Sequence, residues 1–209
     1  ETALAKRWGK LDGVVMFPTT HDITPETLAP CLTFVKNILR AGNEVLLVSK
    51  PNLHCVDVLT LSLEAYKRQL QFRFTIGTLD EELAAYWEPG APSPAERVEA
   101  LALARVRGYR TSVSAEPMLN TDEAPRLVHI VRPHVSESIW LGKLNKPGER
   151  VSCEGEEDRR RLGEIHAGQT SARIKALYEL LKDDELVRWK DSIKLVVGLK
   201  VATKPGTDR

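Results

Sequence analysis

The sequence predicts an α/β fold in which parallel strands alternate with helices. Segments typical of strands begin about every 30 residues, which is the period of a repeated strand–helix unit. The clearest unit runs from Phe72 to Leu119 and has the pattern strand, loop, helix, strand. A crossover helix between two neighbouring strands implies that the strands are parallel. We therefore expect five parallel strands, near residues 14–18, 44–49, 72–76, 111–116 and 138–143.

Start and stop signals mark the helices between these strands. Residues 93–96, Ser-Pro-Ala-Glu, have the spacing of a capping box with proline at the first helical position, and Gly108 supplies the stop. One earlier helix is expected to open at Thr24 and to end near Gly42, and another to span Val56–Leu70. Each predicted strand after the first is thus preceded by a connection long enough for a crossover.

The two strands of the central unit each carry a polar face. Arg73 and Thr75 alternate with phenylalanines, and Ser112, Ser114 and Glu116 alternate with small or apolar residues. Successive side chains of a strand point to opposite faces of its sheet. We expect these five residues to point into a barrel interior and the phenylalanines to face the helices.

Polar residues at the ends of four strands favour part of a β/α barrel over a doubly wound sheet. In barrels the carboxyl ends of the strands converge on the active site. The competing interpretation is that these residues are only helix caps and turns. No G-x-G-x-x-G pattern supports a dinucleotide-binding sheet. The residues concerned are Thr19, Thr20, His21, Asp22, Ser49, Lys50, Thr75 and Glu116.

Composition indicates a single soluble core. The 209 residues are 42% hydrophobic and carry a net charge of +1, which argues neither for nor against a nucleic-acid partner. No apolar run approaches the roughly 18 residues of a membrane helix, so no membrane partner is expected. Cys31, Cys55 and Cys153 are odd in number and widely spaced, which favours a reducing cytoplasm over a disulfide framework or a zinc site.

Five segments follow one another with strand–helix spacing: FPTTHDITPE, GNEVLLVSKP, FRFTIGT, WEPGAPSPAERVEALALARVRGYRTSVSAEPML and IWLGKLN. In this order they resemble the radical S-adenosylmethionine (SAM) superfamily and, within it, the subgroup related to spore photoproduct lyase. This resemblance implies a partial (β/α)6 barrel of the TIM type. In that family a C-x-x-x-C-x-x-C loop after the first strand holds a [4Fe-4S] cluster. The reduced cluster cleaves SAM to a 5′-deoxyadenosyl radical, which abstracts hydrogen from a substrate.

The resemblance also implies which residues bind SAM. Lys50, preceded by Ser49, matches the lysine that family members direct at the SAM carboxylate, and an ammonium suits that anion. Thr75 matches a hydroxyl residue near the methionyl or ribose part. The remaining expected roles are the SAM amino group for Thr20, His21 and Asp22, and the adenosyl side or the substrate for Ser114 and Glu116.

One departure from the family pattern is large, because the three cysteines of this chain cannot form the cluster loop. We expect a first strand and the cluster ligands to lie upstream of residue 1, so that this chain alone is inactive and holds no metal. The complete enzyme would need an electron donor. Its substrate is unknown, and nucleic acid is suggested only by analogy. The alternative is a cluster-free barrel that acts as a ligand-binding or interaction module.

The chain changes character after Asn145. Residues 1–145 are expected to form the partial barrel, and residues 146–209 a C-terminal extension that packs on it, since too few residues remain for an independent core. Within the extension, Ile174, Leu177 and Leu181 have the spacing of an amphipathic helix.

Overall fold

The computed structural model describes residues 8–144 and 155–203 and contains one parallel sheet. Its six strands are hydrogen-bonded in consecutive order, which confirms the predicted α/β class. The five predicted strands are all present, and a sixth, β6, was not predicted. The strands are β1 (Val14–Phe17), β2 (Glu44–Ser49), β3 (Leu70–Thr75), β4 (Arg110–Ala115), β5 (Ser138–Leu141) and β6 (Val187–Trp189).

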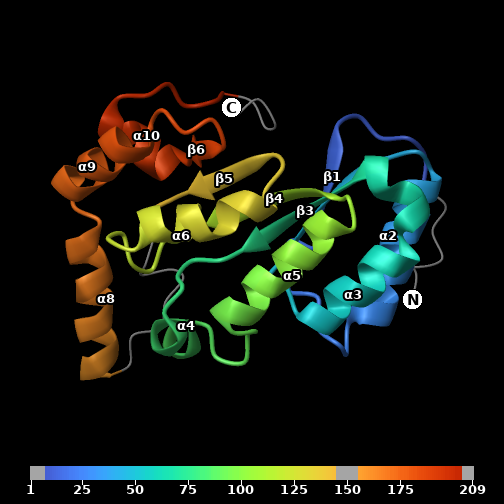
Figure 1. The fold of residues 1–209 in the computed structure, drawn as a ribbon, viewed down its shortest axis with the longest axis horizontal. Helices are drawn as coiled ribbons and strands as arrows, with labels where there is room; N and C mark the ends of the chain where they lie inside the picture. Colours follow the sequence, from blue (N-terminus) through green and yellow to red (C-terminus); the bar gives the residue numbers. More distant parts are fainter. Residues whose placement is uncertain (1–7, 145–154, 204–209) are drawn as a thin grey trace.

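Helices connect every pair of neighbouring strands in the described chain. Since the strand order is consecutive and crossovers are right-handed, the crossover helices gather on one face and the sheet curls as in a barrel. The curl is open, with β1 and β6 as the two edges, and Figure 1 shows them on opposite sides of the sheet. The helices are α2 (Leu28–Arg40), α3 (Leu53–Ser62), α4 (Glu81–Trp87), α5 (Pro94–Val106), α6 (Ala124–Val131), α8 (Glu156–Gly168), α9 (Ser171–Leu181) and α10 (Asp191–Val197), with short 3-10 turns at Glu64–Gln69 and Arg132–His134.

The two strands of the central unit, β3 and β4, each have an apolar face and a polar one, as predicted. Phe72 and Phe74 of β3 are completely buried in the core against the helices. Arg73 and Thr75 point the other way, and in the sheet register they lie beside Ser112 and Ser114 of β4. We call the inner surface opposite the helices the concave face. It is formed by Leu46, Val48, Gln71, Arg73, Thr75, Ser112, Ser114, Ser138, Trp140 and Arg188.

Three predicted helix boundaries were wrong, and one of them is the start of the helix predicted at Val56–Leu70, which begins at Leu53. The helix predicted at Val56–Leu70 ends at Ser62, because Leu70 already pairs with β2 and its preceding residues form a 3-10 turn. Pairing with a neighbouring strand therefore overrides a helical repeat of apolar residues. The helix predicted to open at Thr24 begins at Leu28, since the Thr27 amide donates to the Thr24 carbonyl in a preceding turn.

The predicted cap of α5 is half formed. The Ser93 hydroxyl accepts from the Glu96 amide at 3.2 Å, and Gly108 adopts a positive φ of 81° after the helix. The Glu96 carboxylate does not complete a capping box. It instead accepts from the Leu53 amide at 2.9 Å and so caps the start of α3.

The C-terminal part adds helices and a strand to the sheet. The predicted amphipathic helix is α9, whose Ile174 and Leu177 are buried. Figure 1 shows α8 standing beside the sheet with one end near α4. Tyr86 of α4 donates to the Asp158 carboxylate of α8, and the Arg161 guanidinium lies 4.3 Å from the Tyr86 ring. Within the described ranges, no helix is long and apolar enough to cross a membrane.

Candidate functional site

The carboxyl ends of the strands bring together the first group of predicted site residues. Asp22, from the loop after β1, receives hydrogen bonds from both residues at the end of β2. The Lys50 amide donates to Asp22 Oδ1 at 2.7 Å, and the Ser49 hydroxyl donates to the same oxygen at 3.2 Å. The Lys50 ammonium lies 3.1 Å from Asp22 Oδ2. Three predicted residues thus form one charged cluster.

A second carboxylate, Glu88, completes this cluster. Its Oε1 lies 3.9 Å from Lys50 Nζ, while its Oε2 accepts from the Arg97 guanidinium at 2.6 Å. Arg97 is only 2% exposed and also donates to the Pro92 carbonyl at 2.7 Å, which fixes the loop that carries Glu88. A cavity of about 370 Å³ opens beside this cluster and is lined by Asp22, Lys50, Asn52 and Glu88 among others.

Sequence reasoning noted the Trp-Glu-Pro-Gly segment around Glu88 but gave it no role in the site. Arg97, the fourth residue of α5, was given no role either. The signal was available: Arg97 lies three and four residues before Ala100 and Leu101, on the buried stripe of α5. A charged residue on such a stripe needs a buried partner, and Glu88 is that partner.

The remaining strand-end residues form a second group across the sheet. Thr75 and Ser114 are register neighbours, and Ser114 is the register neighbour of Trp140 on β5. Glu116, after β4, pairs with Lys190, after β6, at 2.9 Å. Lys190 Nζ also lies 5.4 Å from the centre of the Trp140 ring. Sequence reasoning missed Lys190 because β6 is too short to produce a clear strand pattern. It placed Trp140 in a predicted strand, now β5, but gave it no role in the site.

Thr20 and His21 lie against α2. The Thr20 hydroxyl is 3.4 Å from His21 Nδ1, and His21 Nε2 is 3.7 Å from the Cys31 sulfur. The His21 ring also meets Phe17 edge to face. Both side chains are exposed at the mouth of the sheet, next to Asp22 in the chain. The structure therefore brings Asp22, Ser49 and Lys50 into one cluster and places His21 beside it, against Cys31.

The described residues do not fit an iron–sulfur cluster. Among residues 8–144 and 155–203, no group of three or more His, Cys, Asp or Glu side chains is arranged to hold a metal ion. Cys31 and Cys55 are free and buried, and burial raises the pKa of the Cys55 thiol to about 11. Cluster ligation requires thiolates, which such burial disfavours. Cys153 lies outside the described residues.

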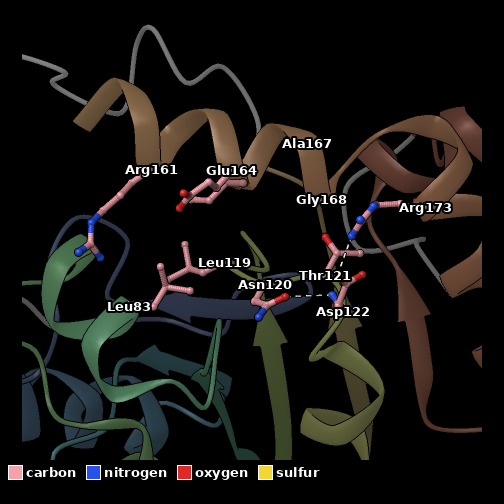
Figure 2. A pocket seen from close by; sticks show the side chains of 11 residues that line it. Leu83, Leu119, Asn120, Thr121, Asp122, Arg161, Glu164, Ala167, Gly168 and Arg173 are labelled. Atoms are coloured by element: carbon pink, nitrogen blue, oxygen red, sulfur yellow. Dashed lines mark hydrogen bonds and ion pairs between the residues drawn. The ribbon is translucent and has the colours of Figure 1, made fainter. Parts of the chain in front are cut away.

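A separate pocket of about 310 Å³ lies between α8 and the loop after β4. Figure 2 shows Leu83 and Leu119 on one wall, with Arg161 and Glu164 of α8 facing them. Arg173 closes one end through an ion pair with Asp122 at 2.6 Å. This pocket contains none of the predicted SAM-binding residues.

Comparison with known proteins supports the fold. No protein-family model matches the chain. A viral protein, described as "Uncharacterized protein ORF301" of Acidianus two-tailed virus, is 35% identical over 138 residues, which are 65% of this chain and 42% of that protein.

Two solved structures of SuiB from Streptococcus suis, a radical SAM enzyme, are similar in fold at 11% identity. The structure with SAM bound has a TM-score of 0.56 over 83% of this chain and 40% of SuiB. The other has a TM-score of 0.50 over 78% of this chain and 36% of SuiB. The chain thus spans less than half the length of the viral protein and of SuiB in these two structures. The open parallel sheet with its helical extension is a partial TIM-like barrel, and its fold matches that of SuiB.

Proposed function

We propose that this chain binds SAM at the carboxyl end of its sheet as part of a radical SAM enzyme. The observation that carries the proposal is the cluster of Asp22, Lys50 and Glu88, at the strand ends of a radical SAM-type fold. A SuiB structure of this fold is described as bound to SAM. The sequence resemblance extends the proposal to the subgroup related to spore photoproduct lyase.

The charges of the cluster match the methionyl end of SAM, which carries an ammonium and a carboxylate. The Lys50 ammonium lies 3.1 Å from the Asp22 carboxylate and 3.9 Å from the Glu88 carboxylate. A ligand carboxylate can therefore pair with the Lys50 ammonium while a ligand ammonium pairs with Asp22. Asp22 stays oriented in this exchange, because the Ser49 hydroxyl and the Lys50 amide hold its Oδ1. Arg97 holds Glu88 in place from the core side.

The neighbouring strands provide the next contacts of the proposed site. The hydroxyls of Thr75 and Ser114 lie in register on the concave face, where the ribose and adenine of SAM would lie beyond Lys50. Glu116, paired with Lys190, borders the adenosyl side or the substrate. Thr20 and His21 are proposed to flank the SAM amino group from the loop after β1.

A [4Fe-4S] cluster would supply the electron that cleaves SAM to a 5′-deoxyadenosyl radical, and an electron donor would reduce the cluster. The described residues contain no ligand set for it. In this proposal the described residues bind SAM and a substrate. Reductive cleavage of SAM additionally needs the cluster, and therefore three further thiolates.

Calorimetric titration of SAM into the purified protein tests the binding site. Lys50→Ala is expected to weaken SAM binding by about 1.5–3 kcal/mol, or roughly 10- to 150-fold, because it removes a charge-assisted contact. Lys175→Ala changes an exposed lysine of α9 and serves as the control with unchanged affinity. Failure of the unmodified protein to bind SAM, or equal affinity in Lys50→Ala, would overturn the proposal.

A second measurement separates the enzyme from a cluster-free binding module. After anaerobic reconstitution with iron and sulfide, a protein that includes the cluster loop should show cluster absorbance and release 5′-deoxyadenosine from SAM. SAM binding without either signal would identify a cluster-free module.

A further inference from the structure

Arg73 occupies the middle of the concave face. It lies two residues before Thr75 on β3, so it is about 6–7 Å deeper in the sheet than the strand end. Its Nε donates to the Ser112 hydroxyl at 3.3 Å, and its guanidinium lies 5.4 Å from the centre of the Trp140 ring. These contacts hold the guanidinium plane but leave most of its five donors free for another partner.

Arg73 lacks a partner of opposite charge within residues 8–144 and 155–203, since no carboxylate lies within 4.0 Å of it. Two buried or half-buried arginines on the helix side do have one. Arg97 pairs with Glu88 at 2.6 Å, and Arg107 pairs with Asp57 at 2.5 Å. Burial lowers the pKa of Arg73, because it disfavours the charged form of the guanidinium. An uncompensated charge in such a place costs stability, and a bound anion would offset that cost.

The surroundings of Arg73 offer donors rather than acceptors. The Gln71 amide already donates to the Ser112 hydroxyl at 3.1 Å. The indole N–H of Trp140 is buried without an acceptor among the described residues. Lys190, the other cation beside the Trp140 ring, is neutralised by Glu116. Arg188, the register neighbour of Trp140 on β6, also has no carboxylate partner among the described residues, but its guanidinium donates to the Glu185 and Val187 carbonyls at 2.7 and 2.8 Å. The cation here that keeps most of its donors free is therefore Arg73.

We propose that Arg73 binds a carboxylate group of the substrate, on the concave face below the SAM site. This inference rests on the proposed function, according to which the substrate lies against the concave face. A single planar guanidinium matches a carboxylate in charge and in its forked geometry. A phosphate monoester carries close to two negative charges and would leave one of them unpaired.

Titration of sodium benzoate at constant ionic strength tests the site without SAM. The indole N–H resonances of the four tryptophans are followed by NMR, and Trp140→Phe identifies the resonance of Trp140. We expect a saturable shift of that resonance. In Arg73→Met the apparent affinity should fall about tenfold or more, as expected for loss of a charge-assisted contact. Inorganic phosphate should bind more weakly than benzoate.

Arg107→Met is the matched control, because Arg107 is also half-buried but is paired on the helix side. It should leave benzoate binding unchanged and lower the melting temperature. Arg73→Met should keep or raise the melting temperature, since it removes an unpaired charge. The SAM affinity of Arg73→Met should stay within about twofold of that of the unmodified protein, because a substitution at one site has little effect on binding at a separate site.

Each contrary result has a distinct meaning. Absence of a saturable Trp140 shift, an equal shift in Arg73→Met, or tighter binding of phosphate would overturn the carboxylate site. If Arg73→Met lowered the melting temperature as much as Arg107→Met does, Arg73 would be a structural residue. If Arg73→Met lost SAM affinity, Arg73 would belong to the SAM site. Either result would overturn the carboxylate site. Normal benzoate binding in a protein that does not bind SAM would refute the proposed function and leave the anion site standing.

Discussion

The helix-covered face and the concave face of the sheet are formed by the same strands but differ in what their side chains contact. Along β3, Phe72 and Phe74 are fully buried against the helices, whereas Arg73 and Thr75, between and after them, remain partly accessible. On the helix side, the buried Tyr109 hydroxyl has a partner, because it donates to the Thr60 carbonyl at 2.5 Å. One face thus supplies folding stability, and the other keeps polar groups available for ligands.

The arginines show the same difference. Arg107 lies on the helix side, where it donates to the Asp57 carboxylate and the Thr60 hydroxyl and so joins α5 to α3. Arg73 lies on the concave face, with one neutral hydroxyl as its hydrogen-bond acceptor. Proteins often retain such strained or uncompensated groups at functional sites at a cost in stability. The comparison predicts opposite responses to substitution on the two faces.

The largest effect is expected for Phe74→Ala. Phe74 is completely buried and its ring lies 5.4 Å from that of Phe72. Its truncation should lower the free energy of unfolding by about 3–5 kcal/mol, because it removes apolar contacts and leaves a cavity. Urea unfolding followed by circular dichroism measures the change. A loss under about 1 kcal/mol would contradict the assignment of this face as the core.

A smaller effect is expected for Tyr109→Phe. It removes one buried hydrogen bond and should cost about 1 kcal/mol at pH 7. Burial raises the pKa of Tyr109 to about 12, above the value of about 10 in an unfolded chain. The contribution of Tyr109 is therefore fully present below pH 10 or so and is lost as the pH rises toward 12 or so.

Unfolding experiments across this alkaline range check the sign. The unmodified protein should lose more stability between about pH 9.5 and 11.5 than Tyr109→Phe, which lacks the titrating hydroxyl. Parallel pH profiles of the two proteins would show that Tyr109 is not responsible for the alkaline loss.

The smallest effect on stability is expected for Thr75→Val. Thr75 follows Phe74 directly but points to the concave face, and valine keeps its shape and its strand preference. The free energy of unfolding should change by no more than about 0.5 kcal/mol, as for substitutions outside the core. SAM affinity, measured by calorimetry, should fall because the hydroxyl is lost. A stability loss comparable to that of Phe74→Ala would remove the distinction between the two faces.

The sequence by itself determined the local features of this protein. Alternation in residues 72–76 and 111–116 predicted the strands and the side to which each residue points, because the strand repeat of two acts between immediate neighbours. The start of α5 followed from Ser93 and Pro94 for the same local reason. Polar residues at the strand ends predicted the edge of the sheet where Asp22, Ser49 and Lys50 meet.

Only the tertiary structure decided which distant residues meet there. Arg97 was recognised as the support of Glu88, and Glu88 as a partner of Lys50, once α5 had been placed against the end of β3. Lys190 reaches Glu116 because β6 joins the sheet beside β5, and three residues of strand give too little alternation to predict that pairing. These contacts link residues far apart in the chain, and their geometry depends on the packing of whole elements, which local periodicity does not encode.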